Sequence, residues 1–277
     1  GAREIGYMFG QYKRITNKFV GVLTGKGMEF GGSPIRTEAT GYGTVYMMQD
    51  MLKVRGHEIE GKNTVISGSG NVATYAAQKI IQLGGNVTTL SDSAGFVYAK
   101  NGMTQEQLEW VMRLKTVNRG RISEAATEFG WEYREGERPW GVPCDIALPC
   151  ATQNELDEDA AKTLIKNGCL GVAEGANMPS SIQAVHAFQK ARMIFAPAKA
   201  ANAGGVAVSG LEMSQNSARI TWKEEELEQL LRDIMQGIHD SCREHGTVDD
   251  NYIDYVNGAN IAGFIKVADA MIAYGVV

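Results

Sequence analysis

The chain has 277 residues, of which 44% are hydrophobic and 21% charged, an ordinary composition for a globular protein of one or two domains. Its formal net charge of −5 argues against nucleic acid or an anionic membrane as a partner, since neither is attracted by an acidic surface. No apolar run approaches the ~20 residues needed to span a bilayer, and the sequence does not open on a signal-peptide pattern. Four cysteines without a C-x-x-C pair exclude a disulfide framework and favour a reducing compartment, so we expect a cytoplasmic protein.

The N-terminal part of the sequence predicts helices and a loop. Residues 1–15 have the mixed polarity of a helix end, and a Gly-rich loop follows from Thr24 to Ser33. Residues 37–55 keep apolar side chains at helical spacing, and Gly56 then favours a helix end.

From Gly61 onward, short apolar runs alternate with segments of helical periodicity. The runs predict strands at 64–67, 87–90, 145–148, 170–173 and 193–195. The segments between them predict helices at 71–83, 104–115, 120–129, 155–167 and 180–190. Such alternation means parallel strands joined by crossover helices on both faces of a sheet. After residue 204 only helices are expected, at 204–218, 223–245 and 249–273. The predicted fold class is α/β, a Rossmann-like doubly wound and mostly parallel sheet with flanking helical segments at both ends.

The turn at residues 68–73 has the G-x-G-x-x-A pattern of a dinucleotide-binding domain, with a predicted strand before it and a predicted helix after it. Gly68 permits the tight turn, Gly70 leaves room for a pyrophosphate beside the backbone, and Ala73 allows close packing of helix on strand. The free N–H groups at the helix N-terminus favour phosphates. A structural turn without a ligand is the alternative. The candidate cofactor-binding residues of this turn are Gly68, Ser69, Gly70, Asn71 and Val72.

Residues that follow the second predicted strand bear on the choice of cofactor. Asp92 stands where a dinucleotide-binding domain carries the acid that accepts from the ribose 2′-hydroxyl, which by itself favours NAD. Ser91 and Ser93 flank it and could donate to a 2′-phosphate, while Lys115 and Arg121 could supply positive charge. Together these residues favour NADP, with NAD possible, although solvated helix ends are the other interpretation of the two cations.

Several further motifs occur in a consistent order along nearly the whole chain. They are residues 1–7, 23–27, 31–33, 36–43, 149–156, 174–177 and 202–213. In these stretches the chain resembles the hexameric glutamate dehydrogenases of bacterial type, within the Glu/Leu/Phe/Val dehydrogenase superfamily. The resemblance implies reversible NAD(P)-dependent oxidative deamination of L-glutamate to 2-oxoglutarate and ammonia by a homohexamer, in which the cofactor carries the hydride.

The resemblance also implies cofactor contacts. Thr40 and Asn202 correspond to contacts at the nicotinamide end, and Ala151, Thr152 and Asn177 to contacts along the ribose and nicotinamide. From the residues alone, Asn177 could instead cap a helix, and Thr40 could be a polar residue inside a helix.

For the substrate, the resemblance implies that Ser209 donates to the side-chain carboxylate and that Val206 packs beside it. A hydroxyl suits a charged side chain, whereas the related leucine and phenylalanine dehydrogenases are expected to carry an apolar residue there. Alternatively, Ser209 could bond the carbonyl four residues earlier in its own helix.

The resemblance places the catalytic lysine and aspartate of the family upstream of Gly1, so we expect no catalytic residue in this chain. Residues 1–35 are interpreted as the remnant of a substrate domain and a linking helix, 36–218 as the NAD(P)-binding Rossmann domain, and 219–277 as helices returning toward the substrate domain. We expect such a chain to bind dinucleotide but to turn over glutamate negligibly. The alternatives are another amino-acid dehydrogenase of the superfamily and a non-catalytic dinucleotide-binding module. The histidines lack metal-ligand spacing, so no metal is expected.

Overall fold

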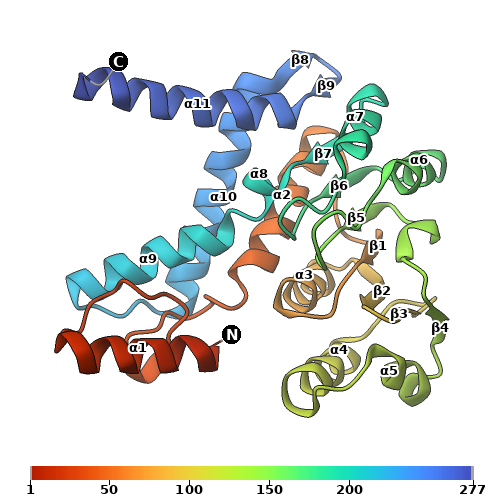
Figure 1. Cartoon of the computed structure of the whole chain (residues 1–277). Helices are drawn as coiled ribbons and strands as arrows, with labels where there is room; N and C mark the ends of the chain where they lie inside the picture. The colour runs from red at the N-terminus through yellow and green to blue at the C-terminus, as the bar shows by residue number, and fades with distance from the viewer. Residues whose placement is uncertain (1, 276–277) are drawn as a thin grey trace.

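The computed structural model describes residues 2–275 and consists of a seven-stranded sheet flanked by helices, with a group of long helices at one end (Figure 1). The strand order is β4-β3-β2-β1-β5-β6-β7. Strands β2, β1, β5, β6 and β7 run parallel to one another. Their bounds are β1 Asn63–Ile66, β2 Asn86–Asp92, β5 Ile146–Leu148, β6 Gly171–Ala173 and β7 Ile194–Ala196. The predicted α/β, mostly parallel fold is confirmed.

The sheet is covered on both faces, because alternate side chains of the parallel strands enter two separate cores. Ile66 of β1 lies in one core and Val65 in the other. The first core contains side chains from α2 (Ala39–Val54), α3 (Asn71–Gln82), α4 (Gln105–Arg113) and α5 (Ile122–Phe129). The second contains side chains from α6 (Glu158–Lys166), α7 (Ile182–Lys190) and the turn η3 (Pro139–Gly141). This is the doubly wound arrangement that the sequence predicts.

Two strands at one edge were not predicted. β3 (Gly95–Tyr98) pairs antiparallel with β2, and β4 (Glu132–Glu135) pairs antiparallel with β3. Strand β4 has the sequence Glu-Tyr-Arg-Glu and no fully buried residue, so it carries no apolar pattern. It is a strand because β3 supplies an edge with which its backbone can pair.

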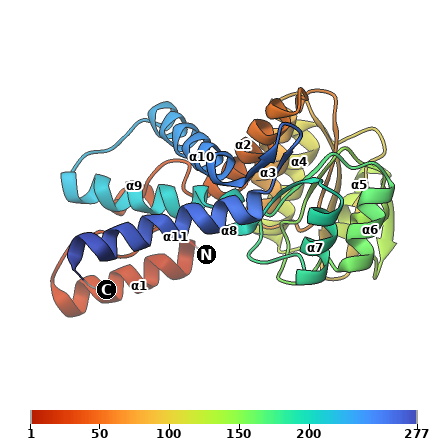
Figure 2. The same cartoon turned by 90° about the horizontal axis from the view of Figure 1, so that it is seen from above.

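The remaining helices form the group at the end of the sheet. Their bounds are α1 Ala2–Thr16, α8 Ala198–Ala201, α9 Gly204–Ala218, α10 Glu224–Gly246 and α11 Tyr255–Tyr274, with a short turn η1 at Met28–Phe30. The views in Figures 1 and 2 place both described chain ends in this group. No helix in residues 2–275 is both long and apolar enough to cross a membrane.

The helix predicted at 249–273 begins later in the structure, at Tyr255. A hairpin of β8 (Thr247–Asp249) and β9 (Tyr252–Ile253) occupies the start of the predicted 249–273 segment. The Asp249 side chain accepts from the N–H of Asn251 and stabilises the turn between the two strands. Helix α11 begins only at Tyr255, where Asp254 accepts from the N–H groups of Val256 and Asn257 as an N-cap.

Helices α2 and α9 cross at very short range, which fixes the helical group against the sheet. A Cβ added to Gly204 would lie 2.3 Å from the carbonyl oxygen of Ala39, and one added to Gly205 would lie 2.3 Å from Oγ1 of Thr40. A side chain at Gly204 would meet backbone and separate the helices, whereas one at Gly205 would displace the Thr40 hydroxyl. Through this contact, residues of α9 lie beside the N-terminus of α2.

Candidate functional site

Two adjoining pockets form one cleft along the carboxyl ends of the parallel strands. One has a volume of about 810 Å³ and extends from the 68–72 turn to the residues after β2. The other, of about 620 Å³, extends to Arg36 and Ser209. The residues common to both are Val72, Cys150, Ala151 and Thr152. The cleft lies where the chain leaves β1 on one side and β5 on the other, which is the point at which open α/β sheets bind ligands.

The geometry of the 68–73 turn fits a dinucleotide. Gly68 has a φ of +86°, and a Cβ there would lie 3.0 Å from both Cα of Ala151 and the carbonyl oxygen of Cys150. A Cβ at Gly70 would meet no protein atom within 4 Å, and this residue lines the cleft. Gly70 is also the N-cap of α3 and provides no side-chain cap, so the first N–H groups of the helix are available to a phosphate.

Ser91 and Asp92, both predicted as cofactor contacts, line the cleft but already have protein partners. Oγ of Ser91 accepts from the N–H of Gly68 at 2.7 Å and thereby supports the turn. The two carboxylate oxygens of Asp92 accept from the N–H groups of Ala94 and Ile122, at 2.9 and 3.0 Å. Burial by itself raises the pKa of Asp92, but these two donors and the nearby cations outweigh it and hold the pKa below its usual value.

Ser93, Lys115 and Arg121, which the sequence analysis proposes for a 2′-phosphate, lie around Asp92. Nη1 of Arg121 donates to Oγ of Ser93 at 3.1 Å, and Nζ of Lys115 lies 3.6 Å from Oδ2 of Asp92. Lys115 belongs to a π-helical continuation of α4, η2 (Leu114–Asn118), whereas the sequence predicts only a regular helix. π-Helical turns are frequent at functional sites because they redirect side chains.

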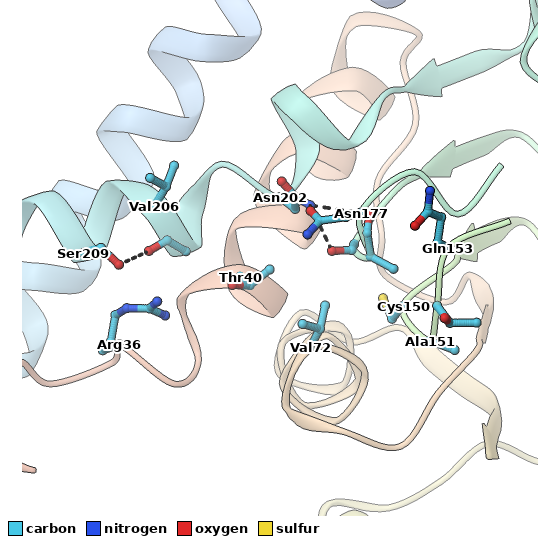
Figure 3. Close-up of a pocket in the computed structure, with 14 residues that line it drawn as sticks. Arg36, Thr40, Val72, Cys150, Ala151, Gln153, Asn177, Asn202, Val206 and Ser209 are labelled. Atoms are coloured by element: carbon cyan, nitrogen blue, oxygen red, sulfur yellow. Dashed lines mark hydrogen bonds between the residues drawn. The ribbon is translucent and has the colours of Figure 1, made fainter. Parts of the chain in front are cut away.

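At the other end of the cleft, Thr40, Asn177 and Asn202 lie close together although they come from three separate segments (Figure 3). Nδ2 of Asn202 donates to Oδ1 of Asn177 at 2.8 Å and approaches the carbonyl oxygens of Gly175 and Ala176 at 3.3 and 3.4 Å. The loop after β6 is therefore tied to the end of α8.

Ser209 and Val206 line the same end from α9. Oγ of Ser209 donates to the carbonyl oxygen of Gly205 at 3.1 Å, which is the helix-internal bond considered above, and it accepts from Oγ1 of Thr24 at 3.2 Å. Val206 is 73% exposed.

Arg36 is a lining residue that the sequence analysis does not predict. It lies in the turn before α2, which begins at Ala39, and beside Ser209 in the pocket (Figure 3). Its Nε is buried and has no hydrogen-bond partner. An unpaired guanidinium N–H beside a hydroxyl is a donor set suited to a carboxylate. Arg36 begins the 36–43 motif, but nothing in that motif by itself assigns this arginine a contact in the cleft.

A buried ion pair supports this end of the cleft and was also not predicted. Nζ of Lys26 lies 2.6 Å from Oε1 of Glu212, and both side chains are fully buried. The other carboxylate oxygen of Glu212 accepts from the N–H of Gly25 at 2.9 Å. The pair fastens the Gly-rich loop to α9 and so holds Thr24 against Ser209.

Few ionisable groups line this end of the cleft. Among the described residues that line it, only Arg36 and Cys150 can ionise, and burial raises the pKa of the Cys150 thiol. Neither is suited to be a general base near neutral pH. Residues 2–275 contain no group of three or more His, Cys, Asp or Glu side chains that could hold a metal ion.

The model of a protein family described as Glutamate/Leucine/Phenylalanine/Valine dehydrogenase matches residues 31–275. The chain belongs to this family. It is 55% identical to a glutamate dehydrogenase of Bacteroides thetaiotaomicron and 55% identical to an NADP-specific glutamate dehydrogenase of Escherichia coli, each over 277 residues. Both alignments cover 100% of this chain and 62% of the relative, so the chain spans about 62% of their length. A solved glutamate dehydrogenase of Plasmodium falciparum matches with a TM-score of 0.95 at 50% identity, over 99% of this chain and 59% of that one.

Within this dehydrogenase family fold, the structure gathers the predicted residues into two groups. The 68–72 turn, Ser91, Asp92 and Ser93 line the first pocket, with Lys115 and Arg121 bonded at its edge. The predicted residues that line the second pocket are Thr40, Ala151, Thr152, Asn177, Asn202, Val206 and Ser209. Gly1, part of the first matching motif, lies outside the described residues.

Proposed function

We propose that this chain binds NADP(H) in the cleft and acts as part of a glutamate dehydrogenase, which deaminates L-glutamate reversibly to 2-oxoglutarate and ammonia. The observation that carries the proposal is the continuity of the cleft. It leads from a helix N-terminus suited to phosphate to an end where Arg36 and Ser209 present donors suited to a carboxylate. The two relatives from Bacteroides thetaiotaomicron and Escherichia coli are named as glutamate dehydrogenases, which agrees with this substrate class.

In this proposal the pyrophosphate lies against residues 68–72 at the N-terminus of α3. Ser93, Lys115 and Arg121 receive the 2′-phosphate of NADP, while Ser91 and Asp92 hold the turn and orient the cations rather than bind the ribose directly. NADP is favoured and NAD remains possible, in keeping with relatives named NADP-specific in Escherichia coli and NAD(P)-specific in Xylanibacter ruminicola.

The nicotinamide half lies between Ala151–Thr152 and the group formed by Thr40, Asn177 and Asn202. When bound, the cofactor supplies or accepts the hydride. Thr40 and Asn202 orient the ring toward the substrate, and the Ala151–Thr152 backbone keeps water from one side of it.

Arg36 and Ser209 hold the side-chain carboxylate of glutamate, and Val206 packs against its methylene groups. To donate to this carboxylate, the Ser209 hydroxyl turns away from the carbonyl oxygen of Gly205. Proton transfer requires a base, and the described residues that line the end of the cleft with Arg36 and Ser209 do not provide one. We therefore propose that another part of the full-length enzyme supplies it. We also propose that the full-length enzyme assembles as a homohexamer.

A titration of the 277-residue chain with NADPH and NADH, followed by nicotinamide fluorescence, tests the cofactor site. NADPH is expected to bind more tightly, and Gly70→Val is expected to abolish binding of both without lowering the melting temperature, because the added side chain enters the space beside the turn. Absence of binding by the unaltered chain would refute the site, and equal or tighter binding of NADH would refute the preference for NADP.

The catalytic part of the proposal is tested separately. The full-length enzyme is expected to reduce NADP in the presence of L-glutamate, and the 277-residue chain is expected not to do so at a measurable rate. Ordinary turnover by the chain alone would show that a base within it has been overlooked.

A further inference from the structure

Glu155 lines the larger pocket, and its buried side chain links the two walls of the cleft. It is 4% exposed and lies in the loop that follows β5. Its Oε1 accepts from Oγ of Ser67 at 2.9 Å, from the N–H of Ala151 at 2.9 Å and from the N–H of Thr152 at 3.2 Å. Ser67 Oγ in turn accepts from the N–H of Cys150 at 2.9 Å. One buried carboxylate therefore links the end of β1, directly before Gly68, to three consecutive residues of the opposite wall.

This wall is the part of the cleft shared by its two pockets. Cys150, Ala151 and Thr152 line both, so their backbone borders the phosphate end and the nicotinamide end alike. Gly68 packs on Ala151 without space for a methyl group, as its added Cβ would lie 3.0 Å from Cα of Ala151. A displacement of the wall would therefore change the phosphate turn and the width of the cleft together.

The charge of Glu155 is stabilised mainly by these donors. Arg138 and Trp140 donate to the backbone oxygen of Glu155 rather than to its carboxylate. Burial raises the pKa of the Glu155 carboxyl, and the donors Ala151, Ser67 and Thr152 oppose that rise. A buried carboxylate needs its donors in place, and here the donors are the backbone groups that shape the cleft, so the carboxylate and the wall determine each other's position.

We propose that Glu155 is a positioning residue for the dinucleotide, which acts through the Ala151–Thr152 backbone to hold the phosphate turn and the nicotinamide half of the cleft in one geometry. The proposal rests on the dinucleotide site proposed above. It assigns to Glu155 no contact with the cofactor. The adenosine end, where Ser93 and Arg121 meet, is built from other elements and does not depend on it.

The test compares two ligands on the 277-residue chain. NADPH spans the whole cleft, whereas adenosine 2′-monophosphate has no 5′-phosphate and occupies only the adenosine end. Glu155→Gln keeps the shape but weakens three charge-assisted bonds, and it is expected to reduce NADPH affinity about tenfold while leaving the affinity for the monophosphate unchanged. Ser67→Ala is expected to show the same split. The double variant should bind NADPH no more weakly than the worse single variant, since both residues act through one network.

Asp157→Asn is the matched control. It removes the same charge two residues further along the loop, where Asp157 caps α6 by accepting from the N–H of Ala160 at 2.9 Å. Asparagine is an equally good N-cap, so neither ligand should be affected.

The outcomes separate the inference from the proposed function. Unchanged NADPH affinity in both Glu155→Gln and Ser67→Ala would overturn the positioning role. Equal weakening of both ligands, accompanied by a lower melting temperature, would also overturn it, because it would indicate general destabilisation. If the unaltered chain bound neither ligand, the dinucleotide site itself would be refuted. If Glu155→Gln does not fold, Ser67→Ala decides the matter alone.

Discussion

Replacement of Lys26 by methionine is expected to destabilise the chain strongly, because it leaves the fully buried Glu212 carboxylate without a counter-ion. The two groups are 2.6 Å apart, and both side chains have 0% relative exposure. The N–H groups of Gly25 and Lys26 donate to Glu212 before and after the substitution, so their contribution cancels.

The size of the effect follows from this burial. Removal of one partner of a buried ion pair costs about 3–5 kcal/mol, since the remaining charge is uncompensated. Methionine keeps most of the apolar stem of lysine, so loss of packing adds little. Such a loss is a large part of the ~5–15 kcal/mol that stabilises a typical domain. In the double variant Lys26→Met with Glu212→Gln, the uncompensated charge is gone while the amide oxygen can still accept from the backbone. That variant should regain more than half of the loss.

The measurement is urea unfolding of the 277-residue chain followed by circular dichroism, with the free energy of unfolding compared at an unchanged denaturant slope. Lys162→Met serves as the control. It makes the same replacement in an exposed helical pair with Glu158, whose side chains are 60% and 48% exposed, and it should leave the unfolding midpoint unchanged.

Two results would refute this reasoning. Lys26→Met could lower the free energy of unfolding by less than about 1 kcal/mol, the net value of an ordinary hydrogen bond. Alternatively, the double variant could be as unstable as Lys26→Met. The unpaired charge of the Glu212 carboxylate would then not be what destabilises the chain.

Three other substitutions test the cleft. Arg121→Ala should weaken NADPH binding about tenfold in a fluorescence titration and leave NADH binding nearly unchanged, because only NADPH has a 2′-phosphate for the guanidinium. An equal loss of affinity for both cofactors would contradict this role. In the full-length enzyme, Ser209→Val should raise the KM for L-glutamate about tenfold and shift preference toward L-norvaline, and an unchanged ratio of kcat/KM values would contradict the carboxylate contact. Asp92→Asn should lower the melting temperature at pH 7. Folding holds the pKa of the Asp92 carboxyl below its ordinary value of 3.8. The ionised carboxylate therefore stabilises the folded chain above pH 3.8, and this stabilisation is lost as the pH falls through the pKa of the folded state. The difference from the unaltered chain should therefore shrink at pH 3, and a constant difference would count against the assignment.

The sequence predicts the parallel core well because the signals there are local. A strand buried on both faces must be apolar along its length, and β5, β6 and β7 are, while β1 is apolar in its second half, at Val65 and Ile66. Glycine at 68 is required by the backbone of the turn, whereas glycine at 70 leaves space for a ligand beside it, and this local spacing predicts the phosphate site. The edge strand β4 and the β8–β9 hairpin are different, because their backbone pairing is decided by a neighbouring strand and leaves no apolar periodicity.

Within the cleft, the sequence determined which residue types stand after each strand, but only the tertiary structure decided what they bond. The hydroxyl of Ser91 accepts from the N–H of Gly68, and the carboxylate of Asp92 accepts from the N–H groups of residues 94 and 122. Both side chains therefore stabilise the backbone that forms the cleft. Glu155, Arg36 and the Lys26–Glu212 pair lie within the motifs that carry the family resemblance, but no local pattern assigns them a role in the cleft. The members of that pair are 186 residues apart, and a charged residue becomes recognisable as part of a site only when folding has buried it and brought its partner within reach.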